Sequence, residues 1–156
     1  MNKCFPTERD LTETALKSFD FSNFFEYSGW NRWEGREIEG LFGIPDVVIA
    51  FGKTTVLGKR ILRTLAFEMK LRNWQRALIQ AYRYAAFSHY SFVVLDEAFS
   101  APALNNIDRF QKSNIGLITV NVNSNITCHY KPKFSRPYSP YTYRNLFSVL
   151  KPKLFD

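Results

Sequence analysis

Three charged residues in the middle of the chain have the spacing of a metal-dependent hydrolytic site. Asp46 directly precedes an apolar run, and Glu68 and Lys70 lie two positions apart near the end of another. Because side chains alternate along a strand, Glu68 and Lys70 should point to the same face. Carboxylates at neighbouring strand ends can hold Mg²⁺, which prefers oxygen ligands, and a nearby lysine can orient or deprotonate a water. We therefore predict metal ligands at Asp46 and Glu68, with Lys70 acting on the attacking water.

The same residues also have a purely structural interpretation. A proline followed by an aspartate, as at residues 45–46, commonly marks entry into a strand. Glu68 and Lys70 could likewise form an exposed ion pair, which contributes little to stability. Glu68, however, interrupts an otherwise apolar run over residues 65–69. A charge in a buried strand is costly unless it is paired or bound to metal, which favours the functional interpretation.

Residues 73–88 give the clearest helical pattern. Asn73 can cap this helix, and apolar residues recur along one side of it. Gln80 and Tyr84 are four positions apart and therefore share a face. They either form the polar side of an amphipathic helix or support a site at the adjacent strand ends.

The remaining elements follow from apolar periodicity and turn residues. A helix is expected over 8–19 and a loop over 20–35. Strands are expected over 36–42, 46–51, 61–70, 90–95, 115–122 and 126–130. Two further helices are expected over 103–111 and 143–150. This order predicts an α/β fold with one central mixed sheet flanked by helices. We expect a single domain over 1–156, with its core at about 8–130 and a basic, Pro/Tyr-rich extension over 131–156.

Pro45-Asp46 followed by Glu68-Met69-Lys70 resembles the PD-(D/E)xK nuclease superfamily. The resemblance implies a restriction-endonuclease-like fold, in which the aspartate and glutamate bind a divalent metal. The lysine would then assist the water that cuts a phosphodiester bond.

A second match lies in the helix that follows. Gln80-Ala-Tyr-Arg-Tyr84 resembles the Q-x-x-x-Y signature of RecB-type nucleases, in which this helix lies beside the active site. The resemblance also implies an acidic residue from the first helix. Glu13 is the candidate metal ligand, with Glu8 as the alternative, and the spacing does not decide between them. The predicted catalytic set therefore comprises Asp46, Glu68, Lys70, Gln80 and Tyr84.

Charge is divided unevenly along the chain. The net charge is +7, yet residues 1–50 hold five Lys/Arg against nine Asp/Glu, and residues 51–156 hold sixteen against five. A basic surface of this kind fits a polyanion such as nucleic acid, although it could also be solvated surface alone. The candidate nucleic-acid contacts, chosen from the basic residues near the predicted site in sequence, are Lys53, Arg72, Arg76 and Arg83.

Composition excludes several other classes. The chain has 156 residues, of which 46% are hydrophobic and 17% aromatic, unlike a disordered or coiled-coil protein. No apolar run approaches a membrane span, and the start lacks the apolar core of a signal peptide. With two cysteines and two histidines, a zinc site and a disulfide framework are not expected. These features predict a cytoplasmic protein without membrane association.

Together, these observations predict a nuclease dependent on Mg²⁺, or on Mn²⁺ in its place, that acts on DNA. Little of the chain is left for a separate recognition domain, so we expect a homodimer or a subunit of a larger nucleic-acid-processing complex. One alternative is a catalytically inactive module of the same fold that binds nucleic acid or a protein partner. Another is a nuclease directed at RNA.

Overall fold

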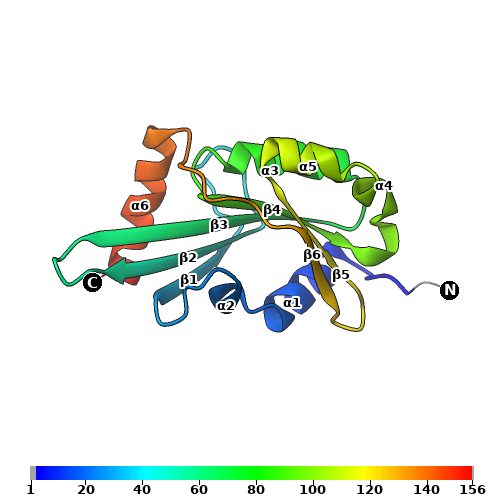
Figure 1. Cartoon of the computed structure of the whole chain (residues 1–156), viewed down its shortest axis with the longest axis horizontal. Helices are drawn as coiled ribbons and strands as arrows, with labels where there is room; N and C mark the ends of the chain where they lie inside the picture. Colours follow the sequence, from blue (N-terminus) through cyan, green and yellow to red (C-terminus); the bar gives the residue numbers. More distant parts are fainter. Residues whose placement is uncertain (1–2, 156) are drawn as a thin grey trace.

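Six strands form one mixed sheet in chain order, β1-β2-β3-β4-β5-β6, in the computed structural model, which describes residues 3–155 (Figure 1). The strands span Asn31–Arg36, Val47–Thr54, Arg60–Lys70, Tyr90–Asp96, Gly116–Val120 and Ile126–Tyr130. β1, β2 and β3 form an antiparallel meander, and β3, β4 and β5 are parallel. β6 returns antiparallel to β5. The predicted α/β fold with a single mixed sheet is confirmed at this level.

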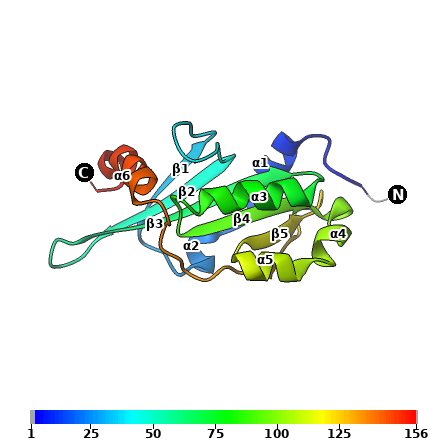
Figure 2. The same cartoon turned by 90° about the horizontal axis from the view of Figure 1, so that it is seen from above.

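Helices cover both faces of the sheet (Figures 1 and 2). α1 and α2 lie on one face, α3, α4 and α5 lie on the other, and α6 lies beside β1 and β2. The helices are α1 (Glu8–Ser18), α2 (Phe21–Phe24), α3 (Trp74–Tyr84), α4 (Ala101–Leu104), α5 (Ile107–Ser113) and α6 (Pro140–Leu154), with a 3₁₀ turn η1 (Glu97–Phe99). Within residues 3–155, none of these helices is both long and apolar enough to span a bilayer.

Alternation along β3 divides the core into two clusters. Leu65, Phe67 and Met69 pack with the aromatic side chains of the α1–α2 region. Leu62 and Ala66, on the opposite face, pack with α3. The predicted period of two is therefore confirmed, and it assigns Glu68 to the face that α3 covers.

The connection from β3 to α3 forms as the sequence predicts. Asn73 adopts a left-handed conformation (φ 54°), and its side chain accepts a hydrogen bond from the backbone N–H of Arg76 (3.3 Å). α3 ends at Tyr84 rather than at Ser88, because the backbone N–H groups of residues 85–87 bond to carbonyls three residues back and form tight turns instead of continuing the α-helix. The expected helix is thus shorter, but Gln80 and Tyr84 remain within it.

Two expectations for the N-terminal region are wrong. The expected strand over 36–42 is absent; the strand is β1, which ends at Arg36, where it pairs with Val47. Glu37, Gly40 and Gly43 all have positive φ, so the chain between β1 and β2 turns repeatedly instead of extending. The expected loop over 20–35 instead contains α2 and most of β1.

Two later helices also differ from expectation. The helix expected over 103–111 is divided: α4 ends at Leu104, α5 begins at Ile107, and Asn105 and Asn106 lie between them. α6 extends beyond 143–150 at both ends, since Ser139 caps it and Pro140 occupies its first turn, where a missing N–H has no consequence. Leu146, Leu150 and Leu154 are buried in the same cluster as α3, so the C-terminal segment packs on the body.

Candidate functional site

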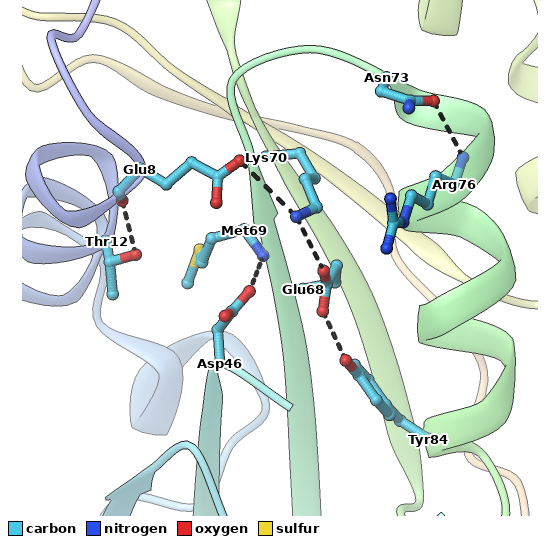
Figure 3. A network of polar contacts seen from close by, with 9 residues as sticks. All are labelled: Glu8, Thr12, Asp46, Glu68, Met69, Lys70, Asn73, Arg76 and Tyr84. Carbon is cyan, nitrogen blue, oxygen red and sulfur yellow. Dashed lines mark hydrogen bonds and ion pairs between the residues drawn. The ribbon is translucent and has the colours of Figure 1, made fainter. Parts of the chain in front are cut away.

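Asp46, Glu68 and Lys70 lie at one end of the β2–β3 pair (Figure 3). Asp46 immediately precedes β2, and its backbone N–H donates to the carbonyl of Phe67 (3.1 Å). The Asp46 carboxylate accepts a hydrogen bond from the backbone N–H of Met69 (2.7 Å). Because the two strands are antiparallel, the start of β2 adjoins the end of β3. The hairpin therefore brings together residues more than twenty positions apart.

Glu68 is the most buried of the three, with 3% of its surface exposed. The Tyr84 hydroxyl donates to Oε2 of Glu68 (2.5 Å) and also lies 3.0 Å from the carbonyl oxygen of Ile44. Oε1 of Glu68 lies 3.6 Å from the ammonium nitrogen of Lys70. Glu68 and Lys70 are thus not the exposed ion pair of the structural interpretation, because the carboxylate is enclosed by the sheet and α3.

Lys70, the last residue of β3, lies between Glu68 and the start of α1 (Figure 3). Its Nζ is 3.7 Å from Oε1 of Glu8, in the first turn of α1, and its side chain is 24% exposed. Glu13 does not share this position. It hydrogen-bonds to Arg36, and this bond holds the pKa of its carboxyl below the ordinary value. The structure therefore brings Glu8, the alternative, beside Lys70, and directs Glu13 to Arg36.

Burial dominates the electrostatics of the carboxylates. It raises the pKa of Glu68 to about 7, and the neighbouring Asp46 charge adds to this, while Tyr84 and Lys70 oppose it. Burial likewise raises the pKa of Asp46, against the effect of the Met69 N–H. The Tyr84 hydroxyl has a raised pKa through burial and the Glu68 charge, so it stays protonated as a donor. Burial therefore disfavours the charged form of both carboxylates, and a cation bound beside them would favour it.

Gln80 and Arg76 extend the same face of α3. Gln80 lies one turn before Tyr84, and its buried side-chain oxygen has no hydrogen-bond partner among residues 3–155. Arg76 lies a further turn back, and its side chain extends from α3 toward the end of β3 (Figure 3). Arg76, Gln80 and Tyr84 thus form one row beside Glu68. The spacing of Gln80 and Tyr84 predicted part of this row.

A cavity of about 390 Å³ adjoins Asp46 on the side away from α3. It is lined by Asp46 and Met69, by the first turns of α1 through Glu8 and Arg9, and by Arg36 at the end of β1. Its lining carries both charge signs, so it can hold a polar or anionic group close to the Asp46 carboxylate. Sequence reasoning missed Arg9, because nothing in its local spacing links it to Asp46.

The four predicted nucleic-acid contacts are spread over the molecule. Arg72 follows β3 at the Lys70 end, with its guanidinium 4.0 Å from the ring centre of Phe99, and Arg76 lies in the first turn of α3. Arg83 lies at the far end of α3. Lys53 is seven residues along β2 from Asp46, which is about 23 Å at the rise of a strand. Arg72 and Arg76 are therefore at the site's end of the sheet, whereas Lys53 and Arg83 are not.

Within residues 3–155, no three His, Cys, Asp or Glu side chains form a group that could hold a metal. Asp46 and Glu68 are the two carboxylates that could supply oxygen ligands to Mg²⁺, an ion that keeps several waters. Comparison with protein-family models, with curated proteins and with solved structures gives no match to this chain.

Proposed function

We propose that this chain is a metal-dependent nuclease of the PD-(D/E)xK type that hydrolyses phosphodiester bonds in DNA. The observation that carries the proposal is the convergence of Asp46, Glu68 and Lys70 at one end of the β2–β3 hairpin, with Tyr84 bonded to Glu68. The order of elements also supports it: α1, an antiparallel meander, α3 and a parallel β4. This order is that of the core which the motif resemblance implies.

The residues present fit Mg²⁺, with Mn²⁺ as a substitute. Asp46 and Glu68 would hold the ion, since both offer carboxylate oxygens whose pKa values are raised by burial, and a bound cation would stabilise their charged forms. The side-chain oxygen of Gln80, which has no hydrogen-bond partner among the described residues, would offer the ion a further neutral oxygen ligand, directly or through a water. When bound, such an ion polarises a phosphate oxygen and lowers the pKa of its bound water.

The chain's own residues perform three tasks in this proposal. The Lys70 ammonium stabilises negative charge developing on the phosphate and orients the attacking water. Tyr84 fixes the rotamer of Glu68 through a hydrogen bond that only a protonated hydroxyl can donate. Arg76 adds a guanidinium suited to a phosphate oxygen at the start of α3. Before substrate binds, Lys70 forms ion pairs with both Glu8 and Glu68.

A catalytically inactive module of the same fold is the second candidate. It is favoured by the lack of a third acidic or histidine ligand around Asp46 and Glu68 in the described residues. Both candidates would bind nucleic acid through the basic surface, but only the nuclease would cleave it. In either case we propose that the chain acts as a homodimer or within a larger nucleic-acid-processing complex.

A cleavage panel tests the proposal. Supercoiled plasmid, linear duplex, single-stranded DNA, branched DNA and RNA are each incubated with Mg²⁺, Mn²⁺ or EDTA. We expect cleavage of DNA with either metal and none in EDTA, and Asp46→Asn serves as the matched inactive control. Binding without cleavage of any substrate would favour the inactive module, and cleavage of RNA alone would correct the substrate class.

A further inference from the structure

The β2–β3 hairpin continues beyond the rest of the sheet as a two-stranded ribbon (Figure 1). β1 accompanies β2 only as far as the Asn31–Gly52 pair, and β4 joins β3 only from Leu65 onward. Beyond Gly52 the pairs Lys53–Ile61 and Thr54–Arg60 join β2 to β3 alone. We call residues 53–61 the finger.

The turn at the end of the finger is held by several hydrogen bonds. The N–H of Gly58 donates to the carbonyl of Thr55 (2.9 Å), and the N–H of Thr55 donates to the carbonyl of Lys59 (2.8 Å). The N–H of Lys59 also donates to the Thr55 hydroxyl (3.0 Å). Gly58 has a φ of +81°, which a residue with a side chain rarely adopts. The finger therefore presents its tip in a fixed shape, with little ordering left to do on binding.

The tip carries two apolar residues that the fold does not use. Val56 and Leu57 are fully exposed, at 105% and 96%. Such turn positions usually hold Pro, Asp, Asn or Gly, whose backbone or side-chain properties favour a turn. The side chains of Val56 and Leu57 do not favour a turn in this way. Apolar side chains at the most exposed point of a projecting element are typical of a contact surface.

The charge around the tip has a single sign. Residues 51–63 contain Lys53, Lys59, Arg60 and Arg63 and no Asp or Glu. An apolar tip between basic flanks matches a duplex, whose phosphates border grooves lined by base edges. A two-stranded ribbon fits the major groove of B-DNA, which is about 12 Å wide and 8.5 Å deep.

We propose that the finger inserts into the major groove of duplex DNA, with Val56 and Leu57 against base edges and Lys53 and Lys59 at the phosphates. This inference rests on the proposed nuclease function and names duplex DNA as its substrate. Thr54, the last residue of β2, is eight residues from Asp46, or about 26 Å, which equals about eight base pairs, and the tip lies beyond it. With the ribbon lying along the duplex, the finger contacts it more than about eight base pairs from the cleaved bond.

Binding in EDTA separates the finger from the chemistry. Two double variants alter the finger: Val56→Asn with Leu57→Gly removes the apolar tip, and Lys53→Gln with Lys59→Gln removes charge. The matched control, Lys17→Gln with Lys112→Gln, removes two exposed charges from α1 and α5. Fluorescence anisotropy measures affinity for a duplex of about 30 base pairs and for one of its strands, and flotation measures binding to phosphatidylserine vesicles.

The tip variant should bind the duplex about tenfold more weakly while its affinity for the single strand is unchanged. The charge variant should lower the slope of log affinity against log salt by about 2 relative to the control, because two phosphate contacts are lost. Unchanged duplex affinity in both finger variants would overturn the inference, as would finger-dependent binding to vesicles but not to duplex. Cleavage in Mg²⁺ is read separately: its absence in the wild type would refute the proposed nuclease, while finger-dependent duplex binding would still stand.

Discussion

Replacing Glu68 with glutamine, in the absence of divalent cations, removes a charge that the fold buries at a measurable cost. Burial raises the pKa of the Glu68 carboxyl from the ordinary 4.5 to about 7. Between these pH values the folded protein keeps a proton that the unfolded chain has released. The contribution of Glu68 to the free energy of unfolding is therefore fully present below pH 4.5 and is lost as the pH rises through 7. At about 1.36 kcal/mol per pKa unit, the loss is roughly 3 kcal/mol.

The wild-type protein alone would not reveal this loss, because His89 titrates in the opposite sense. Burial lowers the pKa of His89 from 6.5 to about 4, and its Nδ1 lies 3.0 Å from the backbone nitrogen of Thr64, which donates to it. Across that window the unfolded chain binds a proton that the folded protein excludes, so stability associated with His89 rises with pH. The two contributions are similar in size and nearly cancel. The difference between wild type and Glu68→Gln removes the His89 contribution, which both proteins share.

Urea denaturation followed by circular dichroism, in EDTA, measures that difference. The free energy of unfolding of Glu68→Gln minus that of the wild type should grow by roughly 3 kcal/mol between about pH 4.5 and pH 8. At pH 8 this corresponds to about 6–12 °C in Tm for a chain of this length. The exposed Glu39→Gln variant is the control and should run parallel to the wild type. If Glu68→Gln also runs parallel, Glu68 is not a buried, proton-holding carboxyl and the electrostatic argument for a cation site fails.

Three further variants test the site. Asp46→Asn should abolish cleavage yet keep the fold, because its amide oxygen can still accept a hydrogen bond from the Met69 N–H. Plasmid nicking measures cleavage and circular dichroism measures folding. Nicking at the wild-type rate would show that the active site lies elsewhere. Lys70→Ala should slow cleavage by about 10²–10³ while Mg²⁺ affinity, read by calorimetry, is kept, and Lys70→Arg should restore little rate. A large loss of Mg²⁺ affinity in Lys70→Ala would contradict that role. Tyr84→Phe removes a hydrogen bond that favours the charged form of Glu68, so the pH of half-maximal cleavage should move upward. A profile identical to the wild type would show that Glu68 ionisation does not limit the rate.

The elements that position the site could be predicted because their signals are local. β3 alternates between Glu68 and its apolar neighbours Phe67 and Met69, and this pattern alone assigns opposite faces. Asn73 occupies the cap of α3 with its side chain on the N–H three residues ahead, which fixes the start of that helix. Antiparallel pairing of two adjacent strands then suffices to bring Asp46 to Glu68.

β1 could not be predicted, because its sequence lacks a strand pattern. Asn31–Arg36 is largely polar, and no residue of this edge strand is fully buried. What makes it a strand is the row of pairs with β2, from Asn31–Gly52 to Arg36–Val47, and those partners are distant in sequence. The expected strand over 36–42 relied on apolar residues in a segment whose positive-φ residues actually turn the chain. Tertiary pairing here overrides local propensity.

The choice between Glu8 and Glu13 could not be predicted either, because it also depends on tertiary contacts. The two residues are five positions apart on α1, which places their side chains about 140° apart around its axis, so they cannot serve the same site. The sequence does not state how α1 is rotated against the sheet. Arg36, brought beneath α1 by the unpredicted β1, binds Glu13 and leaves Glu8 facing Lys70. The acidic residue of α1 that lies beside Lys70 is therefore determined by an edge strand, and any acidic ligand from α1 in the proposed mechanism must be Glu8.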